Sequence, residues 1–385
     1  MMRYCNVCFL PSTKPDLYIN KMGICAACIS FKERINVDWN LREKEFKEVI
    51  KRIRSLSESK WDCIIPVSGG KDSTAQVLKI LELGLNPLCV TSTTCDLSEI
   101  GRKNIENIKQ LGVDYMEFSP NPRIRAKLNK IGLDQVGDIS WPEHVGIFTI
   151  PVRAAVQFKV PLIVWGENPQ NEYGGPASAS QNKVLNRRWL EEFGGLLGLR
   201  VTDLFDSYGM READLVPYTY PTDEELESVG VTGLFLGYYF PWDGLTNYFL
   251  AQAHGFSSYG KVIEGSVVDY ENLDNHQTGI HDYFKFLKFG FGRATDLVSI
   301  FIRRGRINRE QGLAIIKLHD GKYPWTYLGK PLGEILERID LTIEEFDEIC
   351  DRFTNKDLFL KDDNGKLLRD SSNSLIKVNY ENQSD

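Results

Sequence analysis

The order of apolar and polar positions predicts alternating strands and helices up to about residue 253. Short apolar runs of strand length recur, and most are followed by segments in which apolar residues have helical spacing. Such alternation favours an α/β fold in which helices cover both faces of a parallel sheet. Ligands bind such sheets at the carboxyl ends of the strands, here in the loops after Val67 and Gly166. The predicted strands are 61–67, 86–92, 113–118, 160–166 and 233–240, and the predicted helices are 38–59, a segment after residue 73, 98–111, 121–133, 143–158 and 243–253.

The pattern divides the chain into three parts. Residues 1–37 contain a cysteine cluster, 38–270 contain the alternating elements with a leading connecting helix, and 271–385 are predicted to be mostly helical. The chain ends in a polar stretch from Asp370, which we expect to be disordered at its end.

Half of the eight cysteines lie near the start of the sequence, as Cys5-x2-Cys8 and Cys25-x2-Cys28. Two CxxC pairs at this spacing are typical of a zinc site, because each tight turn directs two sulfurs toward one point. Four protein ligands leave no open position, so we expect a structural Zn²⁺ in a small knuckle. Unrelated cysteines and a redox dithiol are the alternatives.

Composition narrows the class of protein. The chain has 385 residues, 42% of them hydrophobic and 26% charged, and its formal net charge is −7. These values are typical of a globular protein, and nucleic acid is an unlikely partner without a global positive field. The sequence has no apolar run of membrane-spanning length and its first twenty residues do not resemble a secretory signal, so we expect a cytoplasmic protein that does not bind membranes.

The segment with the clearest chemistry is Ser68-Gly-Gly-Lys-Asp-Ser73, between a predicted strand and a predicted helix. Glycines let the backbone approach an anion closely, and the helix start offers unpaired N–H groups to phosphate. Lys71 adds a positive charge, the two serines add hydroxyl groups, and Asp72 can hold Mg²⁺ or order the loop. A purely structural Gly-Gly turn is the alternative.

This segment resembles the pyrophosphate-binding loop of the PP-loop ATP pyrophosphatases, which cleave ATP between the α and β phosphates and adenylate a carbonyl oxygen. Together with the cysteine knuckle, three further segments resemble the bacterial N-acetyl sugar amidotransferases over about residues 1 to 350. The segments are WGENPQNEYGGP from Trp165, YFPWD from Tyr239 and KFGFGRATD from Lys288. The resemblance implies conversion of an acetamido group to an acetamidino group on a sugar of surface polysaccharides, such as a nucleotide-linked mannuronic acid or a nonulosonic acid.

The resemblance and the residue types together give the candidate site. Lys71 and Asp72 are the expected catalytic residues, and Asp72 and Glu167 are the expected Mg²⁺ ligands, although Glu167 could also be a solvated loop acid. Trp242 and Asp243 pair an aromatic face with an acid, which suits a sugar ring, but a buried tryptophan with a helix-capping aspartate explains them almost as well. The expected ATP-binding residues are Ser68, Gly69, Gly70, Lys71, Asp72, Ser73, Thr91, Gly166 and Glu167, and the expected substrate-binding residues are Asn168, Glu172, Tyr173, Trp242, Asp243, Lys288 and Arg293.

The nitrogen donor is expected to come from outside the chain. The sequence opens Met1-Met2-Arg3 and shows no nucleophilic cysteine of a glutaminase, because Cys5 belongs to the expected zinc site. The resemblance implies a separate glutaminase of the histidine-biosynthesis type, with a barrel subunit that conducts ammonia.

Two other functions remain open at this stage. A tRNA thiolation enzyme would use cysteines near the loop, for which Cys89 and Cys95 are the candidates, and a nucleotide sensor would bind ATP without turnover. The five histidines show no metal-binding spacing. The basic run from Arg303 to Arg309 is either a binding surface for a nucleotide carrier or acidic partner, or a solvated helix end.

Overall fold

A mostly parallel sheet forms the centre of the protein in the computed structural model, which describes residues 2–176, 184–185 and 197–378. The strands have the order β3-β2-β1-β4-β6-β5, in which all pairs are parallel except β5 with β6. The predicted α/β fold with a parallel sheet is therefore confirmed. The strands are β1 (Cys63–Pro66), β2 (Pro87–Ser92), β3 (Asp114–Phe118), β4 (Leu162–Trp165), β5 (Val184–Leu185) and β6 (Thr232–Phe235).

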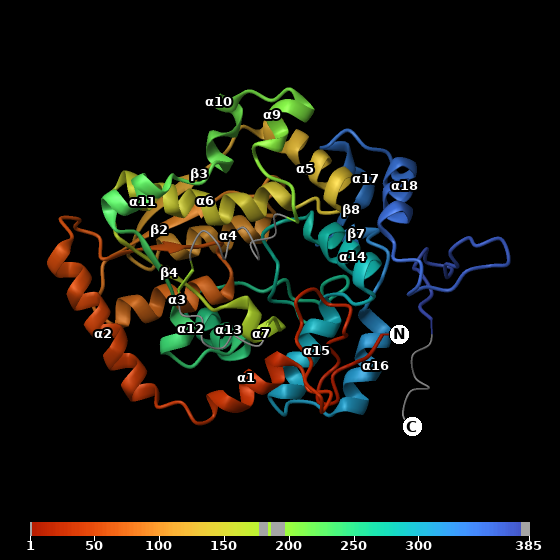
Figure 1. Cartoon of the computed structure of the whole chain (residues 1–385), viewed down its shortest axis with the longest axis horizontal. Helices are drawn as coiled ribbons and strands as arrows, with labels where there is room; N and C mark the ends of the chain where they lie inside the picture. The colour runs from red at the N-terminus through yellow and green to blue at the C-terminus, as the bar shows by residue number, and fades with distance from the viewer. Residues whose placement is uncertain (1, 177–183, 186–196, 379–385) are drawn as a thin grey trace.

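Helices cover both faces of this sheet because its central strands are apolar on both sides. Ile65 packs with Phe46 and Val77 on one face, whereas Ile64 packs with Ile150 on the other. The helices around the sheet are α2 (Trp39–Leu56), α3 (Lys71–Glu82), α4 (Glu99–Lys109), α5 (Pro122–Val136), α6 (Trp141–Gln157) and α11 (Asp223–Val229). Figure 1 shows α6 and α3 on either side of the strands.

The predicted strand 233–240 is wrong in its second half. β6 ends at Phe235, and the chain then forms the helical turn α12 (Leu236–Tyr239). The turn begins where Gly237 donates a backbone hydrogen bond of 2.9 Å to Gly166, at the carboxyl end of β4. The long apolar run is therefore shared between a strand and a helical turn, both of which are buried.

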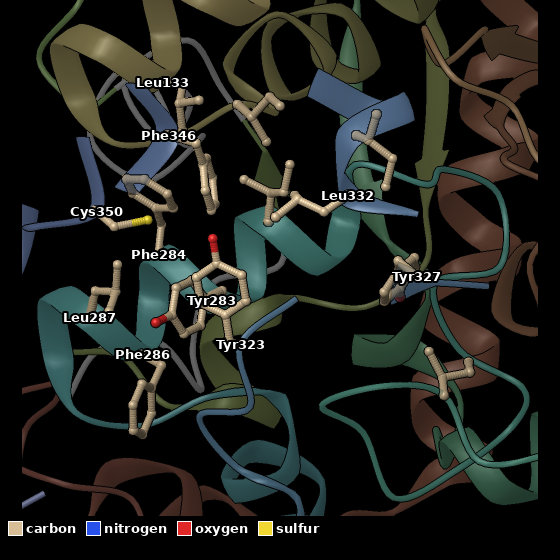
Figure 2. Packing of buried hydrophobic residues seen from close by; sticks show 14 of the residues in the cluster. Leu133, Tyr283, Phe284, Phe286, Leu287, Tyr323, Tyr327, Leu332, Phe346 and Cys350 are labelled. Carbon is tan, nitrogen blue, oxygen red and sulfur yellow. The ribbon is translucent and has the colours of Figure 1, made fainter. Parts of the chain in front are cut away.

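The C-terminal region is mostly helical, as predicted, and its core also includes residues from earlier in the chain, among them Leu133 and Ala251. Aromatic residues of α14 and α18 pack with Tyr323 in this core, as Figure 2 shows. The polar stretch is described as far as residue 378 and contains bridges from Arg369 to Leu375 and from Phe359 to Lys377, whereas its end, for which disorder is predicted, lies outside the described residues. The remaining elements are α1 (Ala26–Arg34), α7 (Pro169–Tyr173), α9 (Asp203–Tyr208), α10 (Glu212–Leu215), the 3-10 turn η2 (Val216–Tyr218), α13 (Gly244–Ala253), α14 (Thr278–Phe289), α15 (Arg293–Arg303), α16 (Arg309–His319), β7 (Thr326–Tyr327), β8 (Lys330–Pro331), α17 (Leu332–Glu337) and α18 (Ile343–Phe353).

The N-terminal segment lies against this C-terminal region, beside α15 and α16 (Figure 1). The amide of Phe9 donates to Ser299, and Arg309 donates to the carbonyl oxygen of Cys5 at 2.8 Å. The cysteine knuckle is thus packed onto residues about 300 positions away in the sequence. Among the described residues, none of the helices combines the length and the apolar character needed to span a membrane.

Candidate active site

The glycine loop joins β1 to α3 at the carboxyl edge of the sheet. Gly69 has φ of +85°, and a Cβ atom there would lie 2.8 Å from the backbone nitrogen of Ile105. Glycine is therefore required at this position. The carbonyl oxygen of Gly70 accepts hydrogen bonds from the hydroxyl groups of Ser73 and Thr74, both at 3.0 Å. The first turn of α3 then presents backbone N–H groups whose hydrogen bonds no carbonyl of the helix can accept. Such free donors are what a phosphate site requires.

Lys71 is the first residue of α3 and is almost completely buried. Its Nζ lies 2.6 Å from Oδ2 of Asp72 and 2.9 Å from Oε1 of Glu271. Burial alone would lower the pKa of Lys71, but the carboxylates of Asp72 and Glu271 outweigh it and raise the pKa well above its usual value. Lys71 is therefore a fixed positive charge. The other oxygen of Asp72 accepts a hydrogen bond of 2.8 Å from Asn247, which orients the carboxylate.

A cavity of about 590 Å³, including its open mouth, lies over the loop, and we call it the loop cavity. Its far wall is formed by the segment from Tyr270 to Asp274. Burial raises the pKa of Asp274 in this wall to about 6. The loop cavity is lined by Ser68, Gly69, Gly70, Lys71, Asp72, Ser73, Gly101, Asn104, Tyr173, Phe256, Tyr270, Glu271, Asn272, Leu273 and Asp274.

A second cavity, of about 640 Å³ with its mouth, lies on the other side of Lys71, and we call it the aromatic cavity. The two cavities share five lining residues: Lys71, Asp72, Tyr173, Tyr270 and Glu271. A phosphate in one cavity and an organic substrate in the other would therefore meet at the same ammonium group. The aromatic cavity is also lined by Gly166, Glu167, Glu172, Trp242, Asp243, Gly244, Leu245, Leu297, Ile300, Phe301 and Arg306.

Glu167 is the unusual carboxylate of the aromatic cavity. Both of its oxygens are buried, and neither has a hydrogen-bond partner among the described residues. Burial and the neighbouring charge of Glu172 raise its pKa well above the usual value. A buried carboxylate without a partner is costly, and a divalent cation shared with Asp72 would supply the missing charge. The residues present therefore fit a Mg²⁺ ion.

Two other acids of this cavity, Glu172 and Asp243, are paired with arginines. Glu172 accepts two hydrogen bonds of 3.1 Å from Arg304, and Asp243 is bonded to Arg306. Asp243 also caps α13, since its carboxylate accepts from the amide of Leu245. Burial would raise the pKa of Asp243, but the hydrogen bond from Arg306 and the charge of Arg304 outweigh it and lower the pKa. Trp242 is buried and Asp243 caps a helix, as the structural alternative for this pair predicts. Both residues nevertheless line the aromatic cavity.

Four predicted site residues use their polar groups elsewhere. The Thr91 hydroxyl is buried and donates to the carbonyl of Val67 at 2.6 Å, and the Asn168 side chain caps α7. Lys288 donates to the carbonyl oxygen of Gly137 at 3.0 Å, at the end of α5. Arg293 pairs with Asp282 and lines a different cavity, although its guanidinium lies 6.0 Å from the ring of Tyr173. The other predicted nucleotide and substrate residues line the loop cavity, the aromatic cavity or both.

Sequence analysis did not identify Glu271, Asn247 or Arg306 as parts of the site. Glu271 and Asn247 contact predicted site residues from segments that lack a recognisable motif, whereas Arg306 lies in the basic run, which the sequence did not place beside Asp243. Asn247 is 175 positions from its partner Asp72. A helix over 243–253 was predicted, but no periodicity shows which of its polar residues faces the glycine loop.

The basic run from Arg303 to Arg309 is not a solvated helix end, because its arginines are bonded to other parts of the fold. Arg303 and Arg304 both donate to Glu172, Arg306 donates to Asp243, and Arg309 donates to carbonyl oxygens of the knuckle. The run therefore connects the cysteine knuckle to the wall of the aromatic cavity.

The four knuckle cysteines form a closed group. Their sulfurs all lie within 4.8 Å of one another, with Sγ to Sγ distances of 3.8 Å for Cys5 and Cys28 and 3.7 Å for Cys8 and Cys25. Thiolates bound at about 2.3 Å to a tetrahedral Zn²⁺ lie about 3.8 Å apart. All four residues are buried, so the group fits a structural zinc ion.

Histidines also form a group that their sequence spacing did not indicate. The Nδ1 atoms of His281 and His144 lie 2.7 Å and 3.0 Å from the two oxygens of Asp138. Burial lowers the pKa of His144, but Asp138 outweighs it and raises the pKa above its usual value. This group connects α6 and α14 outside the two cavities.

Comparisons with known proteins agree with parts of this description. Residues 253–371, which include Tyr270 and Glu271, match the family model described as LPS biosynthesis protein WbpG-like, C-terminal domain. A search among curated proteins finds no match. Among solved structures, a predicted subunit of a tRNA methyltransferase from Methanocaldococcus jannaschii is 13% identical, with 64% of this chain and 89% of that chain covered and a TM-score of 0.26. NMN synthetase from Francisella tularensis is 14% identical, with 57% and 94% covered and a TM-score of 0.28. The protein thus combines an α/β fold with a C-terminal segment, residues 253–371, that is similar to the C-terminal domain of WbpG-like LPS biosynthesis proteins.

Proposed function

We propose that this protein is an ATP-dependent amidotransferase that converts an acetamido group of a bacterial surface-polysaccharide sugar into an acetamidino group. The observation that carries the proposal is the position of Lys71, a buried ammonium shared by the loop cavity and the aromatic cavity. The C-terminal match to an LPS biosynthesis domain supports a sugar of surface polysaccharides as the substrate.

In the proposed reaction, ATP occupies the loop cavity with its phosphates at the start of α3. The acetamido oxygen attacks the α-phosphorus, and the bond to the bridging oxygen of pyrophosphate breaks. Lys71 and the amide groups of the loop stabilise the charge on the departing pyrophosphate, and Ser68 and Ser73 can donate further hydrogen bonds. Mg²⁺ held by Asp72 and Glu167 would neutralise phosphate charge.

The product of this step is an O-adenylated imidate, which ammonia then attacks at carbon. Loss of a proton from nitrogen and departure of AMP leave the amidine. We assign substrate contact to Glu172, Tyr173 and Trp242, because these side chains line the aromatic cavity beside Lys71. Their aromatic faces suit the apolar face of a sugar ring. No covalent enzyme intermediate is needed, so the contribution of the protein is positioning and charge stabilisation.

We further propose that ammonia comes from a separate glutaminase with a barrel subunit that conducts it. Free ammonium at high concentration should replace these subunits. Glutamine should support turnover when they are added and should not do so when they are absent.

The decisive experiment incubates the protein with ATP, Mg²⁺, ammonium and a panel of acetamido sugars. Mass spectrometry should show the replacement of C=O by C=NH, together with sugar-dependent release of AMP and pyrophosphate. Lys71→Met should abolish turnover, whereas Lys79→Met, on the same helix but paired with Glu82 at 3.1 Å, should not. Formation of ADP would contradict the proposal, and ATP binding without turnover would favour a sensor.

No observation favours the thiolation alternative. Burial raises the pKa of Cys89 to about 12 and the pKa of Cys95 well above its usual value. Neither thiol is therefore disposed to be a thiolate at neutral pH. A gel shift with tRNA and a search for a sulfur-containing product would test this alternative directly.

A further inference from the structure

Several contacts join the knuckle to the wall of the aromatic cavity, and in one of them a single side chain contacts both parts. Arg303, in the last turn of α15, has one terminal guanidinium nitrogen 3.8 Å from Sγ of Cys8. Its other terminal nitrogen donates to the backbone carbonyl of Glu172, in the last turn of α7. The guanidinium fork thus connects a candidate zinc ligand with the residue pair Glu172 and Tyr173.

The knuckle also contacts the residues that follow this pair. The amide of Tyr18 donates to the carbonyl of Gly175 at 3.1 Å. Gly174 has φ of +89°, and a Cβ atom there would lie 2.6 Å from Cδ1 of Leu17. α7 has only five residues, so its own hydrogen bonds cannot fix it and its position depends on these neighbours.

The contact between Arg303 and Cys8 is favoured by charge. Zn²⁺ with four thiolates carries two negative charges, and these favour a guanidinium beside them. Loss of the metal would release the knuckle, which would remove the contact of Arg303 with Cys8.

We propose that Arg303 is a positioning residue through which the metal-bound knuckle holds α7, and with it Glu172 and Tyr173, against the aromatic cavity. The metal site then controls the geometry of the substrate wall in addition to the stability of the knuckle. The inference concerns the site assigned above and rests on that assignment for its functional meaning. Its first test requires neither ATP nor sugar, so failure of the proposed reaction would leave the result interpretable.

The test is hydrogen exchange measured by mass spectrometry on the full chain, in peptides covering 167–176 and 3–28. Arg303→Met should accelerate exchange in 167–176 by about tenfold or more, as expected for loss of a charge-assisted hydrogen bond. Removal of the metal from the wild type with a chelator should accelerate both peptides. In Arg303→Met, chelation should accelerate 3–28 but should accelerate 167–176 less than it does in the wild type, because the connection through Arg303 is already broken and only the contacts of Tyr18 and Leu17 with 174–175 remain.

Two further variants keep the test decisive if Arg303→Met folds poorly. Arg303→Lys keeps the charge beside the thiolates but cannot bond both partners in a fork, so metal content should stay normal while 167–176 loses protection. Arg309→Met is the matched control, since Arg309 lies 4.1 Å from the ring of Phe9 and has no hydrogen bond to α7 in the described part of the chain. It should leave 167–176 unchanged while the metal stays bound.

Steady-state kinetics distinguish a positioning role of Arg303 from a general loss of structure. Arg303→Lys should raise KM for the acetamido sugar more than KM for ATP, because Arg303 contacts the substrate wall and not the glycine loop. The proposal is overturned if chelation loosens 3–28 without changing 167–176. It is also overturned if the effects of Arg303→Met and chelation on 167–176 are additive, or if Arg303→Lys changes both KM values equally.

Discussion

Lys71→Met should reduce both stability and turnover, and the two effects can be separated with Glu271. Lys71 and Glu271 have side chains that are 5% and 12% exposed, with 2.9 Å between Nζ and Oε1. Removing one partner of a buried pair costs about 3–5 kcal/mol, because the other charge remains buried. The contact with Asp72 adds little, since the Asp72 side chain is 43% exposed and such pairs contribute at most about 1 kcal/mol.

We therefore expect Lys71→Met to lower the free energy of unfolding by about 3 kcal/mol, the lower end of that range, because Glu271 keeps some contact with water. The double variant Lys71→Met/Glu271→Gln has neither charge and should unfold within about 1 kcal/mol of the wild type. Turnover should fall by about 10²-fold or more in both variants, because neither can stabilise the departing pyrophosphate.

Urea unfolding followed by circular dichroism gives the stabilities, and sugar-dependent pyrophosphate release gives the turnover. Wild-type stability in Lys71→Met would show that the pair with Glu271 contributes nothing. Recovery of turnover in the double variant would show that the single variant failed through misfolding, and Lys71 would have no part in the reaction.

Three further predictions test other parts of the structure. Gly69→Ala should lose about 1–3 kcal/mol or more of stability by urea unfolding, whereas Gly84→Ala, at φ of +70° with no atom within 4 Å, should lose only about 1 kcal/mol; equal losses would contradict the close approach to Ile105. The pair of His144 with Asp138 should stabilise the protein fully below about pH 6.5 and lose its effect as the pH rises through the raised pKa of His144. The free energy of unfolding of the wild type should thus fall relative to His144→Asn across that range, and a rise would refute the ion pair. Glu167→Gln should weaken the binding of Mg²⁺ with ATP, measured by calorimetry. The free energy of unfolding without Mg²⁺ should stay the same or increase. Normal Mg²⁺ binding together with a lower free energy of unfolding would instead show that Glu167 has a structural role.

The sequence was sufficient for the parts of the site that are contiguous. A strand, two glycines and a helix start within twelve residues fix the direction of Lys71 and the exposed amides of α3, because these depend on local backbone geometry. The same is true of the knuckle, where CxxC spacing determines which way the sulfurs point. Local rules also predicted that Asp243 caps a helix, but they did not predict that Arg306 bonds to the same carboxylate.

The remainder depends on long-range packing, which periodicity does not encode. The segment 233–240 is apolar throughout, so alternation cannot show where β6 ends, and the turn is set by the contact of Gly237 with Gly166. Glu271 is two hundred positions from Lys71 in sequence, and its role depends on the path of the chain after α13. Leu375 lies in the polar stretch near the end of the sequence, yet it packs in the C-terminal core.

The arginine run illustrates why clustered charge is a poor guide to exposure. Four arginines within seven residues are expected at a surface because burying even one without a partner is prohibitive. The fold reverses this expectation by gathering anionic or carbonyl partners around the run, namely Glu172, Asp243 and the knuckle. These partners are between 61 and 304 positions away, so no local pattern reveals them.

The acids that line the aromatic cavity differ in whether a cationic side chain is paired with them. This difference distinguishes carboxylates that stabilise the fold from one that folding does not explain. Asp72, Glu172, Asp243 and Glu271 all line the aromatic cavity, and each has a cationic partner that offsets its burial. Glu167 lines the same cavity, and neither of its oxygens has a partner among the described residues. Folding alone gives no reason to keep such a carboxylate, since an amide of the same shape would cost less to bury. Its position beside Asp72 is explained if the missing partner is a cation that arrives with the nucleotide.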